Sequence, residues 1–174
     1  NKDAFIIAFV GAFINRKGSD RVSQAIKLLA EDGVEVQSFF IGKGQGPENL
    51  LPDCDGVIHC GPVEHAKIPE YLNMADVFVL PSLNEGCSNA IIEALACGLP
   101  VISSDRSFNY DVLNDSNSIM INPLDISELS MAIRRLKNDK KFREALSQGA
   151  LHSAQSLTIS NRARRIIDKI KQFV

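Results

Sequence analysis

Short apolar runs alternate with amphipathic helical segments along the whole chain, and this alternation constrains the fold more than any other feature. The run Ala4–Val10 is almost continuously apolar, as expected for a strand buried on both faces. Residues Asp20–Asp32 instead repeat apolar side chains with a helical period, and Gly33 follows as a helix stop. The same reasoning predicts strands at Ala4–Val10, Val34–Ile41, Gly56–Cys60, Val77–Leu80, Pro100–Ser103 and Ser118–Ile121. It predicts helices at Asp20–Asp32, Pro47–Leu51, Ile68–Ala75, Ser88–Cys97, Ile126–Asn138, Lys140–Gln155 and Ser160–Phe173.

This order of elements predicts one α/β domain over residues 1–174, a doubly wound, Rossmann-like parallel sheet with helices on both faces. Ligands of such sheets bind in the crevice at the carboxyl ends of the strands. Functional residues are therefore expected in the loops after the strands, at Gly11–Gly18, Gly42–Gly46, Gly61–His65, Pro81–Asn89 and Ser104–Phe108.

The overall charge and the apolar content exclude several classes of protein. The formal net charge of −2 lacks the basic excess of a nucleic-acid binder. No apolar run approaches the roughly 18 residues that a membrane span needs. Residues Asn1–Gly11 predict a strand rather than a signal peptide, and the chain starts without a methionine. We therefore expect a cytoplasmic domain from a longer protein, with no nucleic-acid partner.

The spacing of cysteines and histidines predicts no metal site. The four cysteines form no C-x-x-C pair, which favours reduced thiols. Asp53-Cys54-Asp55 has the spacing of a metal-binding D-x-D motif, but Pro52 and Gly56 flank it and favour a turn. The histidines are isolated, and we expect core or surface roles for them: His59, His65 and His152.

The loop after the predicted strand Val77–Leu80 leads into a candidate anion site. It contains Gly86, and a helix opens near Ser88 and Asn89, both good N-cap residues. The first amides of a helix lack intrahelical partners and carry the positive end of its dipole. At the carboxyl edge of a parallel sheet, such an end suits a diphosphate.

Glu93 is the one charged residue in the otherwise apolar stretch 90–99. A helix that is apolar all round is predicted to be buried, and a buried carboxylate needs hydrogen-bond donors. Helical side chains lean toward the N-terminus, so Glu93 is expected to point toward the mouth of the anion site. Ribose hydroxyls are suitable donors, and a backbone amide or a basic side chain is the equally weighted alternative.

Glu85, seven intervening residues and Glu93 reproduce the E-x7-E motif of glycosyltransferase family 4. The flanking sequences ADVFVLPSLNEG and EALACGLPVISSD match the family as well. From Phe5 to about Asp139 the chain resembles the C-terminal, donor-binding half of a retaining enzyme with the GT-B fold. The resemblance implies a missing N-terminal domain that binds a sugar or lipid-linked acceptor. It implies a nucleotide diphosphate sugar as donor, with no cofactor and no catalytic metal.

The resemblance also implies roles for the motif residues. Glu93 would bind the ribose, and Glu85 would approach the sugar hydroxyls and the reacting face. The distal phosphate and the sugar would contact the amides of Gly86, Cys87, Ser88 and Asn89.

A phosphate clamp follows the first predicted strand. The family pattern G-R-x-x-x-x-K-G is matched here at Gly11, Lys17 and Gly18, but Ala12 stands where the arginine is usual. Fixed cations near the departing diphosphate lower the barrier to transfer, so Lys17 is assigned a catalytic role. Arg16 is predicted either to replace the missing arginine or to point into solvent.

Three residues are candidates for contacts near the nucleoside. Gly42 and Gly44 belong to a glycine-rich turn that resembles one the family places close to the nucleotide, although a G-x-G pair alone is a weak signal. Val63 lies in a segment that resembles the family's base contact. Nothing here distinguishes a UDP-linked donor from a GDP- or ADP-linked one.

Two further hypotheses stay open. Ala12 favours a non-catalytic nucleotide- or sugar-binding module that has lost turnover. The last predicted helix carries basic residues beside an apolar stripe, which fits either a surface helix packed by one face or a peripheral contact with the inner face of a membrane.

Overall fold

The computed structural model describes residues 4–44 and 50–172. Parts of three predicted elements lie outside these residues: the end of the Gly42–Gly46 turn, most of the Pro47–Leu51 helix and Phe173. Leu50 and Leu51 are described and are not helical.

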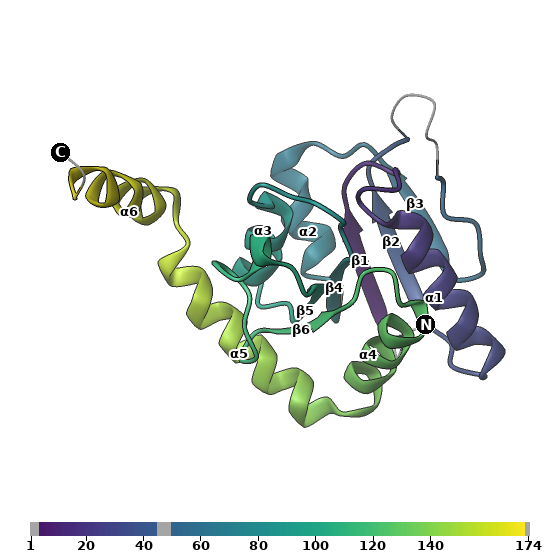
Figure 1. Cartoon of the computed structure of the whole chain (residues 1–174). Coiled ribbons are helices and arrows are strands. Elements are labelled where there is room, and N and C mark those ends of the chain that lie inside the picture. The colour runs from purple at the N-terminus through teal and green to yellow at the C-terminus, as the bar shows by residue number, and fades with distance from the viewer. Residues whose placement is uncertain (1–3, 45–49, 173–174) are drawn as a thin grey trace.

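Six parallel strands form a single sheet in the order β3-β2-β1-β4-β5-β6 (Figure 1). The strands are β1 (Ile6–Val10), β2 (Gln37–Ile41), β3 (Val57–Gly61), β4 (Val77–Leu80), β5 (Val101–Ser104) and β6 (Ser118–Ile121). The chain order reverses between β1 and β4, which makes this the topological switch point of a doubly wound sheet. The prediction of a Rossmann-like α/β fold is therefore confirmed.

Helices cover both faces of this sheet. They are α1 (Ser19–Glu31), α2 (Ile68–Leu72), α3 (Asn89–Ala96), α4 (Ile126–Asn138), α5 (Lys140–Ser156) and α6 (Ile159–Lys171), with short 3-10 helices η1 (His65–Lys67) and η2 (Ser107–Asn109). α1 packs against α4 on one face, while α3 packs against α2 and α5 on the other (Figure 1).

The core lies where strands of high apolar content meet the helices. Every residue of β4 and β5 is buried. The Phe9 and Phe40 rings on the paired strands β1 and β2 stack with centroids 5.2 Å apart. Burial of each such ring contributes roughly 1.5–3 kcal/mol.

Several predicted bounds were too long, for local reasons. The β2 prediction began at Val34, but the Val34 amide donates to the Leu29 carbonyl and so completes the end of α1. Gly33 ends that helix in the left-handed region, at φ +72°, as predicted. α4 has its predicted bounds because the Asp125 side chain accepts from the Glu128 amide and caps it.

α6 differs from the other long helices because none of its described residues is buried. It projects from the end of α5 away from the sheet (Figure 1). Large apolar side chains on it are exposed, namely Ile159, Ile166, Ile167 and Ile170. Among the described residues, no helix combines the length and the apolar character that crossing a membrane requires.

Candidate functional site

Three glycines bring the loops after β1, β2 and β3 into close contact. The Gly11 amide donates to the Ile41 carbonyl, and the Gly42 amide donates to the Gly61 carbonyl, both at 2.9 Å. A Cβ atom on Gly42 would lie 1.9 Å from the Gly11 carbonyl oxygen, and Gly42 has a φ of +145°. Only glycine fits such an approach, so the predicted glycine-rich turn has a packing reason as well.

The predicted nucleoside-side residues lie at this same edge. Gly44 forms an isolated parallel bridge with Phe13, so the loop after β2 runs alongside the loop after β1. Val63 is half-buried in the loop after β3. These positions agree with a base-side role, which itself stays a prediction.

Lys17 and Glu85 meet across the switch point, although 68 residues separate them. Lys17 Nζ donates to Glu85 Oε1 at 2.6 Å. The side chains are 17% and 9% exposed, so water screens this ion pair only partly. The fold therefore brings together the two residues predicted to be catalytic.

Arg16 reaches the same loop. Its Nη1 donates to the Asn84 carbonyl at 2.8 Å and lies 3.6 Å from Glu85 Oε1. Its own carbonyl accepts from the Leu83 amide at 2.8 Å. The side chain is half exposed and is directed to the β4 loop rather than straight into solvent. Its replacement of the missing arginine stays a prediction.

Arg21, which the sequence analysis missed, links the loops after β1 and β4. It is 5% exposed, and its guanidinium donates to the Asn15 side chain and carbonyl and to the Pro81 carbonyl. Burial lowers the pKa of Arg21 from its ordinary value, and the Asp20 charge partly offsets this. No sequence pattern distinguishes this arginine from an exposed one in the first turn of a helix.

The N-terminus of α3 begins where predicted but is not capped as predicted. Ser88 occupies the N-cap position and is buried, yet its described side chain makes no capping hydrogen bond. Gly86, Cys87 and Asn89 are exposed around it. A Cβ atom on Gly86 would meet no heavy atom of the described residues within 4 Å. The helix end is thus open on the side of the predicted donor loop.

Glu93 is less buried than its apolar helix predicted. Its side chain is 24% exposed, and Ala96 on the same helix is exposed. α3 buries one side, with Ile91 and Leu95, and leaves the rest at the surface. The prediction of a fully buried helix was wrong because apolar composition alone does not reveal how many neighbours surround an eight-residue helix.

His65 is the partner of Glu93, and the sequence analysis missed it as well. Its Nε2 lies 2.9 Å from Glu93 Oε1. A basic side chain was one of the partners predicted for Glu93, and in the structure Glu93 contacts one. The position of α2 beside α3 brings η1 to this carboxylate. Burial raises the pKa of Cys97, which lies one turn after Glu93 at the end of α3, and the Glu93 charge raises it further.

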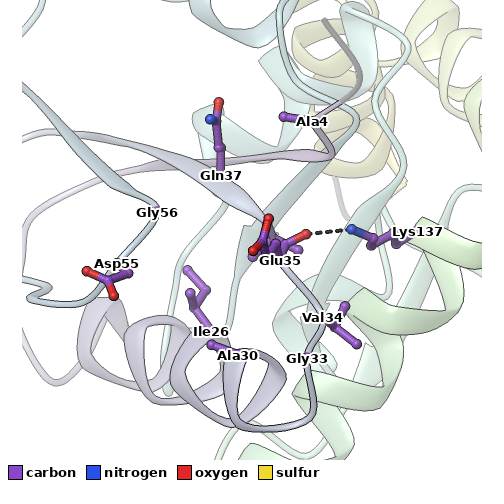
Figure 2. Close-up of a pocket in the computed structure, with 11 residues that line it drawn as sticks. Ala4, Ile26, Ala30, Gly33, Val34, Glu35, Gln37, Asp55, Gly56 and Lys137 are labelled. Atoms are coloured by element: carbon purple, nitrogen blue, oxygen red, sulfur yellow. Dashed lines mark hydrogen bonds between the residues drawn. The ribbon is translucent and has the colours of Figure 1, made fainter. Parts of the chain in front are cut away.

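A cavity of about 430 Å³ lies at the opposite end of the sheet (Figure 2). It is lined by the end of α1, the start of β2 and Lys137, whose Nζ donates to the Glu35 carbonyl. Asp55 and Gly56 also line it. The chain bends at Cys54 and turns at Asp55 and Gly56 just before β3, in agreement with the predicted turn. The cavity contains none of the predicted donor residues.

The described part of the chain contains no cluster of three or more metal-ligating side chains. All four cysteines are free thiols.

The domain is thus a Rossmann-like α/β domain in which charged loops meet at the switch point of the sheet. A sequence profile described as Glycosyl transferases group 1 matches residues 4–139, and the chain belongs to this family.

Curated relatives are longer than this chain. LpsD of Rhizobium meliloti, a lipopolysaccharide core biosynthesis glycosyltransferase, is 31% identical over 84% of this chain and 43% of its own. CapM of Staphylococcus aureus, a capsular polysaccharide biosynthesis glycosyltransferase, is 28% identical over 83% of this chain and 40% of its own. The chain spans about two fifths of the length of such relatives.

Solved structures share the fold. The sucrose-phosphate synthase of Thermosynechococcus elongatus superposes with a TM-score of 0.83 at 24% identity, covering 99% of this chain and 46% of that one. HepE of Anabaena in complex with UDP-glucose superposes with a TM-score of 0.83 at 18% identity, covering 97% and 49%.

Proposed function

We propose that this chain is the donor-binding half of a retaining glycosyltransferase that moves a sugar from a nucleotide diphosphate sugar to an acceptor hydroxyl. The contact between Lys17 and Glu85 beside the open N-terminus of α3 is the observation that carries the proposal. It joins a cation, a carboxylate and unpartnered amides at the switch point, where doubly wound sheets bind their ligands.

Each charged group has a role in this proposal. The diphosphate binds Lys17, Arg16 and the amides from Gly86 to Asn89. Glu85 accepts hydrogen bonds from the sugar hydroxyls, and Glu93 accepts hydrogen bonds from the ribose hydroxyls. Gly42, Gly44 and Val63 contact the nucleoside through backbone and apolar atoms.

The chemistry follows from these positions. The acceptor oxygen forms a bond to the anomeric carbon while the bond from that carbon to the distal phosphate oxygen breaks. The acceptor proton passes to the departing diphosphate on the same face, so the anomeric configuration is kept. Lys17 and the α3 amides stabilise the negative charge that develops on the diphosphate. The proposal includes no metal and no cofactor.

The relatives support the setting. LpsD and CapM are described as enzymes of lipopolysaccharide core and capsular polysaccharide synthesis, and the HepE structure that shares this fold is a complex with UDP-glucose. We place this protein in polysaccharide or glycolipid synthesis in the cytoplasm, with its acceptor bound by an N-terminal half outside this chain. The proposed donor is a sugar linked to UDP, GDP or ADP.

Contact with the inner face of a membrane is part of the same proposal. It is supported by the exposed isoleucines of α6 beside five basic residues: Arg162, Arg164, Arg165, Lys169 and Lys171. Sedimentation with anionic phosphatidylglycerol vesicles should retain the chain, and neutral phosphatidylcholine vesicles should not. Equal recovery with both lipids contradicts the contact.

Calorimetric titration with UDP, GDP and ADP tests the donor site directly. We expect one of the three to bind, and Lys17→Met to weaken its binding about ten-fold because a charge-assisted contact to phosphate is lost. Lys27→Met, which changes an exposed lysine on α1 outside the proposed donor loops, is the matched control. Absence of binding to all three nucleotides refutes the site.

Ala12 favours the second candidate, a nucleotide- or sugar-binding module without turnover. The full-length protein separates the two candidates. A transferase releases product of retained configuration by NMR and loses transfer with Glu85→Ala. A binding module takes up nucleotide without releasing any transfer product.

A further inference from the structure

The Glu93 carboxylate has one hydrogen-bond partner among the described residues, the imidazole of His65. The other side chains of the stretch 90–99 are apolar or absent and offer no N–H or O–H donor, the weak Cys97 thiol apart. Three quarters of the Glu93 side chain is covered, so water hydrates this charge only in part. The direction of the carboxylate therefore depends strongly on His65.

The geometry of the pair leaves part of the carboxylate open. His65 Nε2 contacts Oε1, and no described side chain contacts Oε2. A carboxylate accepts only, so the contact is a hydrogen bond in the form of His65 that carries a proton on Nε2. Each carboxylate oxygen has two lone pairs, which leaves acceptor capacity for the two hydroxyls of a ribose.

The two residues come from different elements at the carboxyl edge of the sheet. His65 opens η1 in the loop after β3, where Val63 also lies, and Glu93 lies on α3 after β4. The His65 side chain is 82% exposed, and its loop lies at the carboxyl edge of the sheet, where doubly wound sheets bind their ligands. The contact fixes the carboxylate relative to the loop that precedes it by 28 residues.

We propose that His65 is a positioning residue for nucleotide binding, which holds the Glu93 carboxylate in the orientation that receives the ribose hydroxyls. This inference rests on the proposed function, in which Glu93 binds the ribose. His65 acts through Glu93 rather than on the reacting atoms. Its effect on affinity therefore depends on the presence of the ribose hydroxyls in the ligand.

The experiment is a titration of two ligands into four proteins. The ligands are the nucleotide that binds, from UDP, GDP and ADP, and its 2′,3′-dideoxy form. The proteins are the wild type, His65→Ala, His65→Gln and Lys67→Ala. Lys67 is an exposed neighbour on the same 3-10 helix and is the matched control.

We expect His65→Ala to weaken binding of the complete nucleotide about five-fold and to leave the dideoxy form within about two-fold, as for coupled groups. His65→Gln keeps a donor at a similar reach and should restore most of the affinity. Lys67→Ala should change neither ligand. In a Glu93→Ala background, His65→Ala should cause no further loss.

Each contrary result has a distinct meaning. Unchanged or tighter binding of the complete nucleotide by His65→Ala overturns the positioning role, and so does an equal loss for both ligands. These results leave the donor site itself in place. Absence of nucleotide binding by the wild type refutes the proposed function and this inference with it. Thermal unfolding of each variant checks its fold, which a change at so exposed a side chain should leave intact.

Discussion

The two glutamates of the E-x7-E motif occupy different environments. Glu85 is 9% exposed and faces two cations from the loop after β1, with Lys17 at 2.6 Å and Arg16 at 3.6 Å. Glu93 is 24% exposed and faces one histidine on the surface. The first joins two halves of the sheet across its switch point, and the second joins a helix to a neighbouring loop.

The two identical side chains therefore have different roles: one contributes to the stability of the fold, and the other is available to bind a ligand. Glu85 contributes to the closure of the β1 and β4 loops, so its removal affects folding as well as the site. Glu93 contributes little to the fold because its partner is exposed, so its removal should affect ligand binding more than stability. Substitutions at Gly42, Glu85 and Glu93 test this division.

Gly42→Ala should disrupt the loops on which Glu85 and its cations depend. The new Cβ atom would lie 1.9 Å from the Gly11 carbonyl oxygen at a φ of +145°. We expect the free energy of unfolding to fall by about 3 kcal/mol in urea denaturation. Gly86→Ala is the control, because its Cβ atom meets no described heavy atom and should cost within about 0.5 kcal/mol. Equal stability of the two variants contradicts the close approach of the loops.

Glu85→Gln should lower the free energy of unfolding by about 1.5 kcal/mol, because Lys17 loses a charged partner in a site mostly shielded from water. Glu93→Gln should lower it by about 0.5 kcal/mol or less, as is typical of pairs with an exposed member. Urea denaturation of both variants measures the difference. A larger loss at Glu93 reverses the comparison.

Nucleotide affinity should depend more on Glu93 than on Glu85, the opposite of the order expected for the free energy of unfolding. Glu93→Gln should weaken binding of the nucleotide about ten-fold, because the charged carboxylate that accepts from both ribose hydroxyls becomes a neutral amide with one acceptor oxygen. Glu85→Gln should change affinity for the sugar-free nucleotide by about two-fold or less, since Glu85 is assigned to the sugar. Calorimetry with the nucleotide diphosphate alone decides between them, and equal losses would remove the distinction.

Cys97 should report the charge of Glu93. Burial raises the pKa of the Cys97 thiol, and the Glu93 charge raises it further. A raised pKa means less thiolate at a given pH, so Cys97 should react slowly with iodoacetamide near pH 8. Glu93→Gln removes the second cause and should speed the reaction. The exposed Cys87 is the internal control, and an unchanged Cys97 rate in the variant would count against the coupling.

The sequence alone predicted most of the elements, since their signals are local. Ser118–Ile121 and Ile126–Asn138 have the predicted bounds, because a turn precedes the strand and Asp125 caps the helix. The start of β2 was wrong because Val34 bonds back to the preceding helix. The missed residues, Arg21 and His65, differ from ordinary surface residues only in contacts with distant segments.

Hydrophobic periodicity and loop composition by themselves determined the alternation of strands and helices, the parallel sheet and the loops that follow its strands. They did so because period and turn residues depend on near neighbours in the chain. Only the tertiary structure decided that Lys17 meets Glu85 and that His65 meets Glu93. Those contacts depend on the strand order and on the path of each crossover between strands. No local sequence pattern identifies the partner of a side chain when that partner is distant in the chain.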